Sequence, residues 1–259
     1  MEETVLLQSA GHIATLRLNR PQTFNALDEE SLKLLLEKVN AVAADPEIRV
    51  LIVGSTSPKS FASGADIAQM LHNSPAQSER FCDLGFWAFQ ALADLPQPVI
   101  AAVGGHCLGG GLELAMACDL RIASRRAKFG YPEVRLGILP GWGGLHRTAS
   151  AIGMARAKEM MFTGQAITAE EALRIGLVNQ VVEPEALEDV CMQLAQTIAA
   201  NAPLPIRLIK QTIGAAASAP PAAANAIADR AMGLCFSSDD QKEGMRAFLE
   251  KRPPVFRGR

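Results

Sequence analysis

Two glycine-rich turns in the first half of the sequence could bind a negatively charged oxygen. The first spans Phe61 to Ile67 and the second spans His106 to Glu113, and each follows an apolar run and leads into a predicted helix. The first residues of a helix have backbone N–H groups without internal partners and carry partial positive charge. Two such helix starts facing each other would form an oxyanion hole. The alternative is that the glycines serve only the strand-to-helix turns; three adjacent glycines in the second turn favour the binding site.

Two glutamates near these turns could transfer protons. Glu113 lies in the first turn of the helix after the triple glycine, between two leucines, and Glu133 directly follows a proline. An apolar environment raises the pKa of a carboxyl group toward the range that suits proton transfer, so the pair could act as acid and base. Each also has a structural interpretation. Glu113 would stabilise the positive end of its helix, and Glu133 would pair with Arg135 or Arg147.

Other residue types that often carry chemistry are less informative. Tyr131, the only tyrosine, and Trp142 lie near Glu133 in the sequence and could line an acyl pocket or simply pack in the core. His106 stands alone beside the second turn and is more typical of a structural histidine. No serine lies in a GxSxG motif, which disfavours an α/β-hydrolase. No GxGxxG follows the first strand, which disfavours a Rossmann dinucleotide site.

The segments that carry these groups alternate between predicted strands and helices. A hairpin over 5–18 ends before Asn19-Arg20-Pro21, and Asp28 is an N-cap candidate for an amphipathic helix over 29–42. Buried strands are predicted at 50–54, 98–103 and 120–123, a loop at 55–64, and helices at 78–95 and 112–118. This alternation indicates an α/β fold, in which the turns that follow the strands position the candidate residues.

The final third of the sequence changes to helical patterns. Capping boxes at Thr168–Glu171 and Ser238–Gln241 predict the starts of two helices, and further helices are predicted at 185–200, 205–217 and 222–236. The segment 201–205, which contains two prolines, interrupts them. We therefore predict a core domain at 1–200 that holds the candidate site and a helical domain at 201–259.

The composition limits the classes of function. Hydrophobic residues make up 49% and charged residues 20% of the chain, as in ordinary globular proteins, and a net charge of −2 provides no overall positive field for nucleic acid or an anionic membrane. The acidic start lacks the basic and apolar regions of a secretion signal, so a cytoplasmic protein is predicted. The five cysteines form no CxxC motif or Cys/His cluster, which indicates reduced thiols and no metal site.

Ordered blocks of sequence resemble the enoyl-CoA hydratase/isomerase (crotonase) superfamily over nearly the whole chain. So many blocks in one order make a chance similarity implausible. The blocks are Leu18-Asn19-Arg20-Pro21, Asn25-Ala26-Leu27, Phe61 to Ile67, Gly109 to Glu113, Ala117-Cys118-Asp119, Phe129 to Glu133, Leu136 to Gly141, Phe162-Thr163-Gly164, Ala169 to Val178, Glu243-Gly244-Met245 and Phe248 to Arg252.

The resemblance implies a fold and a catalytic centre. The expected fold is a spiral of ββα units with a C-terminal helical domain that forms trimers, or a dimer of trimers. The matching positions place the N–H groups of Ala65 and Gly110 in an oxyanion hole that polarises a thioester carbonyl. They also make Glu113 and Glu133 the catalytic acids and assign the backbone of Gly141 to positioning water.

The resemblance also implies where coenzyme A lies, as part of an acyl-CoA substrate and not as a separate cofactor. Its nucleotide part is expected along the segments 24–26 and 62–68, and two C-terminal residues of a neighbouring subunit would close over it. The substrate-binding residues implied in this way are Phe24, Ala26, Ala62, Asp66, Ile67, Ala68, Tyr131, Trp142, Phe248 and Lys251. Ala68, Tyr131 and Trp142 depart from the residues most frequent in the family, which leaves the preferred acyl group open.

The implied reaction is the reversible syn addition of water to a trans-2-enoyl-CoA, a step of fatty acid metabolism. The nearest alternative is isomerisation of a 3-enoyl-CoA, or a lyase or hydrolase reaction on the same scaffold, for which one acid often suffices. The presence of both Glu113 and Glu133 favours hydration. A more distant alternative is a non-catalytic RNA-binding relative. The net charge and the lack of a basic stripe with interleaved aromatic residues disfavour it.

Overall fold

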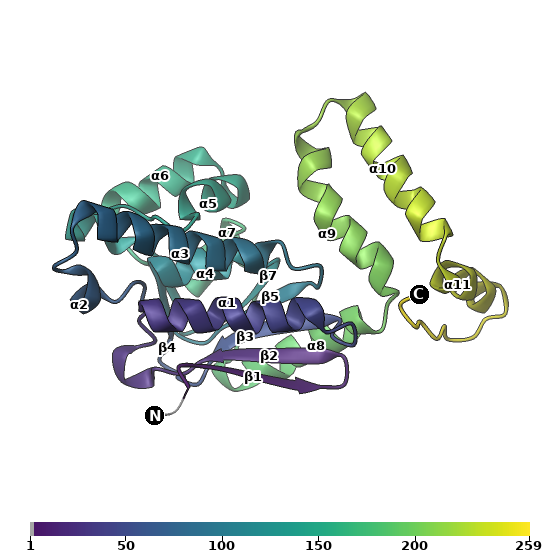
Figure 1. Cartoon of the computed structure of the whole chain (residues 1–259), viewed down its shortest axis with the longest axis horizontal. Helices are drawn as coiled ribbons and strands as arrows, with labels where there is room; N and C mark the ends of the chain where they lie inside the picture. Colours follow the sequence, from purple (N-terminus) through teal and green to yellow (C-terminus); the bar gives the residue numbers. More distant parts are fainter. Residues whose placement is uncertain (1–2) are drawn as a thin grey trace.

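A six-stranded sheet forms the frame of the protein in the computed structural model, which describes residues 3–259 (Figure 1). The strand order is β1-β2-β3-β5-β7-β10, in which β1 and β2 form an antiparallel hairpin and all other neighbours are parallel. β3 and β5 are buried along nearly their whole length, as expected for parallel strands covered on both faces. The strands span Val5–Ala10 (β1), Ile13–Leu18 (β2), Val50–Ser55 (β3), Val99–Val103 (β5), Leu120–Ser124 (β7) and Gln180–Val182 (β10).

A second, four-stranded sheet collects the short strands that follow the long ones. Its order is β4-β6-β8-β9, with strands at Ser60–Ala62, His106–Leu108, Lys128–Gly130 and Ile167–Thr168. β3, β5 and β7 are each followed by one of these strands and then by helices, so the chain repeats a ββα unit. β4 and β6 pair in parallel, with Ser60 opposite His106. Because parallel neighbours end at the same edge, the two glycine-rich turns emerge side by side.

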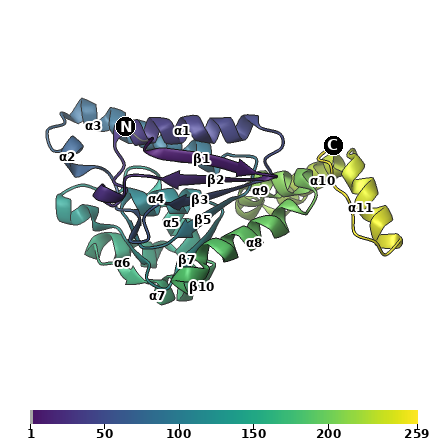
Figure 2. The same cartoon turned by 90° about the horizontal axis from the view of Figure 1, so that it is seen from below.

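Helices cover both faces of the large sheet. Alternate residues of β3 show this directly, because Leu51 and Val53 face the cluster under α1, α3 and α4, whereas Val50 and Ile52 face α8. In Figure 2, α1 and α8 lie on opposite sides of the strands. The helices span Glu29–Ala44 (α1), Ile67–Met70 (α2), Pro75–Ala93 (α3), Gly110–Ala117 (α4), Gly144–Ile152 (α5), Met154–Thr163 (α6), Ala169–Arg174 (α7), Leu187–Ala199 (α8), Pro203–Ser218 (α9), Pro221–Phe236 (α10) and Asp239–Leu249 (α11), with 3-10 turns at Pro21–Thr23, Pro132–Leu136 and Pro184–Ala186.

Helix α1 forms as its sequence predicts. The carboxylate of Asp28 accepts a hydrogen bond from the N–H of Ser31 at 2.8 Å, which satisfies one of the free donors at the helix start. Leu32, Leu35 and Val39 recur at helical spacing and are buried against the core. The N-cap halves of the capping boxes predicted for α7 and α11 are also present, with the hydroxyls of Thr168 and Ser238 accepting the N–H groups of Glu171 and Gln241.

The C-terminal helices form an arm that extends away from the sheets (Figures 1 and 2). α9 begins at Pro203, within the predicted break, and packs against α10. Arg49 ties the arm to the core by donating hydrogen bonds to the carbonyl oxygens of Ala199 and Phe256. Several large apolar side chains of the arm are exposed: Ile209, Ile213, Met232, Leu234, Phe236, Met245, Phe248 and Leu249. Across residues 3–259, no helix combines the length and apolar character needed to span a bilayer.

The structure differs from the sequence prediction in several short elements. β4 lies inside the segment predicted as a loop at 55–64, and its three residues are too few to show a hydrophobic period. α5 and α6, of nine and ten residues, were not predicted, and each begins after a glycine that provides no side-chain cap to mark a helix start. α4 also begins at Gly110, two residues before the predicted start, so the glycines form the helix start itself.

Candidate active site

The two glycine-rich turns touch each other, as the pairing of β4 with β6 requires. Gly64 has a φ of +110°, and a side chain there would begin 3.2 Å from the carbonyl oxygen of Leu108 and 3.4 Å from the nitrogen of Gly110. Both the backbone conformation and the space therefore demand glycine at this position. The residues after Gly64 and the start of α4 consequently border one shared cleft.

Two residues that line this cleft have backbone N–H groups with no hydrogen-bond acceptor among residues 3–259. Leu27 donates to the carbonyl of Gly64 at 2.8 Å, and Asp66 donates back to Leu27 at 2.9 Å. The N–H of Ala65, between these two bonds, points away from Leu27. Gly110 is the first residue of α4, and its N–H has no acceptor within the helix. Ala65 and Gly110 both line the cleft, so their N–H groups are available to an oxygen bound there.

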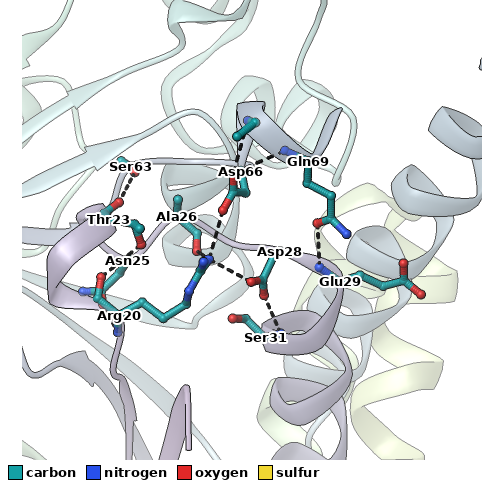
Figure 3. A network of polar contacts seen from close by, with 11 residues as sticks. Arg20, Thr23, Asn25, Ala26, Asp28, Glu29, Ser31, Ser63, Asp66 and Gln69 are labelled. Carbon is teal, nitrogen blue, oxygen red and sulfur yellow. Dashed lines mark hydrogen bonds and ion pairs between the residues drawn. The ribbon is translucent and has the colours of Figure 1, made fainter. Parts of the chain in front are cut away.

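A partly buried ion-pair network holds the segment of Leu27 against Ala65 (Figure 3). The guanidinium of Arg20 donates to the carbonyl of Ala26 at 2.6 Å and pairs with Asp28 at 3.0 Å and with Asp66 at 3.2 Å. Each aspartate also caps a helix, Asp28 at α1 and Asp66 at α2. Arg20 therefore links the residues that flank Leu27 to the residue that follows Ala65.

Removing this link is expected to misplace the N–H of Ala65. For Arg20→Met we expect kcat for hydration to fall by ~10–10²-fold, because catalytic groups lose rate steeply when displaced. Two aspartates left without a counterion should also lower the free energy of unfolding by roughly 2 kcal/mol, less than for a fully buried pair. Steady-state kinetics and denaturant unfolding measure both effects.

The matched control for this change is Lys33→Met. Lys33 pairs with Glu29 at 2.6 Å on the exposed side of α1. Such a surface pair is worth at most about 0.5 kcal/mol, and it has no contact with the cleft. An Arg20→Met enzyme with the kcat of the Lys33→Met enzyme would show that the network does not position Ala65. Arg20→Lys should recover part of the loss, because it keeps the charge and loses the planar fork.

Glu113 is buried in the first turn of α4, three residues after Gly110, and is held by a loop far along the chain. Its side chain projects from the first turn of α4 and is 1% exposed. One carboxylate oxygen accepts the N–H groups of Trp142 and Gly144, both at 2.7 Å. Burial raises the pKa of Glu113 to about 6, against the lowering effect of the N–H groups of Gly144, Trp142 and Gly141. The carboxyl group is thus oriented by hydrogen bonds, and its charged form predominates at neutral pH.

Glu133, unlike Glu113, is buried with one carboxyl oxygen left without a hydrogen bond from the described residues. It lies in the 3-10 turn after β8 and is 7% exposed, and its Oε2 has no hydrogen-bond partner among residues 3–259. Burial, with a smaller contribution from the charge of Glu113, raises its pKa to about 7. The salt bridge that we considered from sequence is absent from the described residues, because Arg135 donates to Thr163 and Arg147 to Trp142 and Gln90. The free carboxyl oxygen can therefore hold or release a proton.

The structure brings all five residues predicted to be catalytic, to form the oxyanion hole or to position water to one cleft of about 540 Å³ that is open to solvent. Ala65, Gly110, Glu113, Glu133 and Gly141 all line it. Of the predicted substrate-binding residues, Ile67 and Trp142 also line it. The cleft walls further include Ser63, Met70, Phe81, Cys82, Leu136, Ile138 and Leu139.

The other predicted substrate-binding residues lie outside these walls. Phe24 is half exposed, with a φ of +54°, on the loop before α1. Ala62 is fully buried, and Asp66 is occupied by Arg20 and the start of α2. Ala26 lies on the same loop as Phe24, and Ala68 lies in the first turn of α2. Phe248 and Lys251 belong to the C-terminal arm, remote from the cleft of their own chain (Figure 1).

Tyr131 does not line the cleft, contrary to the sequence prediction. Its side chain is fully buried, and its hydroxyl shares a hydrogen bond of 2.6 Å with the hydroxyl of Thr148 on α5. Burial accordingly raises the pKa of the phenol well above its usual value. The ring packs under Gly144, so it supports the loop that holds Glu113. The side chain of Tyr131 is therefore directed into the core, although Glu133, two residues later, lines the cleft.

α3 contributes to the site in a way that was not predicted from the sequence. Phe81 and Cys82 line the cleft from this helix, and Gly85, one turn later, accommodates Trp142. The only signal in the sequence was the glycine within a helical pattern, which often marks a close approach of another element. A search of the sequence for reactive side chains does not select these residues, because their side chains are apolar or nearly so.

A larger hollow, of about 940 Å³, lies on the other face of the large sheet under α8. Of its three charged lining residues, Arg17 and Glu188 pair with each other at 2.8 Å, and Arg126 pairs with Glu185 at 3.5 Å. None of the predicted site residues lines it, and no buried carboxyl faces it. The smaller cleft with Glu113 and Glu133 is therefore the candidate active site.

Comparison with known proteins yields one consistent family. Residues 8–259 match the sequence profile described as enoyl-CoA hydratase/isomerase. The chain is 45% identical over 96% of its length to a short-chain-enoyl-CoA hydratase of Clostridium acetobutylicum, of which it covers 95%. It is 44% identical to a crotonyl-CoA hydratase of Syntrophomonas wolfei, with 98% of both chains covered. Among solved structures, an enoyl-CoA hydratase of Bacillus anthracis superposes with a TM-score of 0.96 at 34% identity, covering 99% of this chain and all of the other.

Proposed function

Since this chain belongs to the enoyl-CoA hydratase/isomerase family, we propose that its cleft catalyses the reversible syn addition of water to a trans-2-enoyl-CoA. The protein is a hydro-lyase, an enoyl-CoA hydratase like its relatives. The observation that supports the assignment of the chemistry to particular residues is the placement of two buried carboxyl groups, from separate segments, on the cleft that also receives two free N–H groups.

In the proposed mechanism the thioester oxygen lies between the N–H groups of Ala65 and Gly110. Negative charge develops on this oxygen as water adds to the conjugated double bond, and the two fixed dipoles stabilise it. Losing one such donor typically costs ~10²–10³-fold in rate. Both groups belong to turns that pack closely, because a Cβ at Gly64 would lie only 3.4 Å from the nitrogen of Gly110.

The two glutamates divide the proton transfers. Glu113 takes a proton from the attacking water while the water oxygen forms its bond to C3. The electron pair of the double bond moves to C2, which receives a proton from Glu133. Both carboxyl groups act from one side of the substrate, which accounts for syn addition, and the backbone of Gly141, beside Glu113, would help to orient the water. Each positioned acid or base contributes roughly 10²–10⁴-fold.

Water addition changes the oxidation state of neither the substrate as a whole nor the enzyme. The proposed mechanism therefore uses only groups of this chain and the substrate, with coenzyme A as part of the substrate. We place its nucleotide part along the loops 24–26 and 62–68 that flank the cleft. The exposed apolar face of α9 to α11 supports a homotrimer or a dimer of trimers, in which Phe248 and Lys251 would reach a neighbouring subunit. Light scattering would determine the molar mass of the assembly.

The activity is expected to have a bell-shaped pH dependence for hydration. Glu113, with a pKa of about 6, must be deprotonated to accept a proton, so activity falls as the pH is lowered through 6. Glu133, with a pKa of about 7, must be protonated to donate one, so activity falls as the pH is raised through 7. The measurement is kcat/KM for crotonyl-CoA from pH 5 to about 9, followed by loss of the conjugated enoyl thioester absorbance.

This experiment also tests the function itself. Absence of turnover on any enoyl-CoA across this range would contradict the proposed reaction. A pH profile in which kcat/KM falls on only one side would contradict the division of roles between two carboxyl groups, because the pair should titrate in two apparent steps.

A further inference from the structure

The indole of Trp142 is held between two helices at positions where both have glycine. A side chain at Gly85 on α3 would begin 2.3 Å from the indole nitrogen. A side chain at Gly110, the first residue of α4, would begin 2.3 Å from the opposite edge of the indole. Neither helix could approach the ring so closely with any other residue. The ring is therefore confined from both sides.

Two further aromatic rings fix the orientation of the indole. Phe81 and Phe89 of α3 each pack edge-on against it, with ring centroids 5.4 Å apart in both pairs. Trp142 is 3% exposed, and Phe89 is fully buried. Such edge-to-face contacts add to the free energy of burial. The indole consequently has no free space into which it could rotate to make room for a ligand.

This confined ring lies next to the groups that perform the chemistry. The backbone N–H of Trp142 donates to Glu113, and its ring rests on Gly110, whose N–H faces the cleft. Together with Phe81 and Cys82, it lines the inner side of the cleft. An acyl chain that has its thioester oxygen at Gly110 and its C3 at Glu113 would run toward this aromatic wall as it lengthens.

We propose that Trp142 is a specificity-determining residue that closes the inner end of the acyl pocket and restricts the enzyme to short-chain enoyl-CoA substrates. This inference rests on the proposed function of the cleft. It adds the residue that limits the substrate and the side of the cleft on which the limit acts. The alternative route for a long acyl chain is the outer rim, where Ile67, Leu136 and Leu139 are exposed to solvent.

The test compares substrates of different length in one set of variants. We would measure kcat/KM of the wild-type enzyme, Trp142→Phe and Trp142→Leu for crotonyl-CoA and for trans-2-decenoyl-CoA. The decenoyl-to-crotonyl ratio is expected to be low in the wild type and to rise at least ~10-fold in Trp142→Leu, since even one methylene in a tight pocket changes kcat/KM by about that factor. Trp142→Phe, which keeps an aromatic ring in the cluster, should give a smaller rise and guards against misfolding of the leucine variant.

The matched control is Phe89→Leu. It removes an aromatic ring of similar burial from the same cluster, but Phe89 does not line the cleft. The ratio should therefore stay at the wild-type value even if total activity falls through looser packing. A ratio that is already high in the wild type, or that is the same in Trp142→Leu as in Phe89→Leu, would overturn the inference and assign long chains to the outer rim. Absence of crotonyl-CoA turnover in the wild type would instead overturn the proposed function.

Discussion

The Glu113→Gln substitution is expected to lower kcat for hydration of crotonyl-CoA by ~10²–10⁴-fold with little change in KM. Glutamine keeps the oxygen that accepts the N–H groups of Trp142 and Gly144, so the local structure should persist. It cannot accept a proton from water at neutral pH. The loss therefore falls on the chemical step and should appear in single-turnover kinetics.

Glu133→Gln is expected to lower kcat by a similar factor, through the other proton. The side chain keeps its volume, but the carboxyl group with the unpartnered oxygen is replaced by an amide, which cannot protonate C2. The diagnostic measurement is exchange of the C2 proton of the product with solvent deuterium, which should stop in this variant. Glu170→Gln, at an exposed glutamate remote from the cleft, serves as the control and should behave like the wild type.

The two variants together discriminate between hydration and isomerisation. Hydration requires both carboxyl groups, so both substitutions should impair it. If Glu113→Gln hydrated crotonyl-CoA normally while Glu133→Gln abolished proton exchange at C2, a reaction with a single acid, such as double-bond isomerisation, would replace the present assignment.

The second large effect is expected from Gly109→Ala, which should lower kcat/KM by at least ~10²-fold. Gly109 precedes α4 with a φ of +52°, and an added methyl group would lie 2.6 Å from a carboxyl oxygen of Glu133. Either Glu133 must move away or the turn that presents the N–H of Gly110 must shift. Each movement displaces a group proposed to act on the substrate. Steady-state kinetics with crotonyl-CoA measures the loss.

Gly11→Ala is a control for a side chain at positive φ outside the active site. Gly11 has a φ of +57°, and an added methyl group there meets no atom within 4 Å. A side chain at such a φ costs roughly 1–2 kcal/mol, and Gly109, with a ψ of −127°, lies further from the region that residues with side chains adopt. A stability loss in Gly11→Ala with full activity would show that positive-φ strain alone does not lower kcat/KM. Equal activity in the two variants would show that the turn tolerates the contact with Glu133.

Local sequence patterns predicted much of the frame of this protein correctly. The helix that starts after Asp28 and the strands at 50–54, 98–103 and 120–123 follow from burial of alternate or helically spaced residues, and the structure confirms them. The same patterns did not predict β4, because its three residues are too few to show a period. Yet β4 matters most for the site, since its pairing with β6 brings the two turns together.

Residue types and their order in the chain were enough to determine the family and to select Ala65, Gly110, Glu113 and Glu133 as candidates. Only the tertiary structure decided which neighbours in sequence share the site. Tyr131 lies two residues before Glu133 but is bonded to Thr148 in the core, whereas Cys82 joins the site from α3. A side chain's chemical nature is set by its own residue, but its pKa and its reach depend on the burial and hydrogen bonds that distant segments provide. For that reason Glu113 is oriented by the backbone at 142 and 144, and Glu133 is left with one oxygen free.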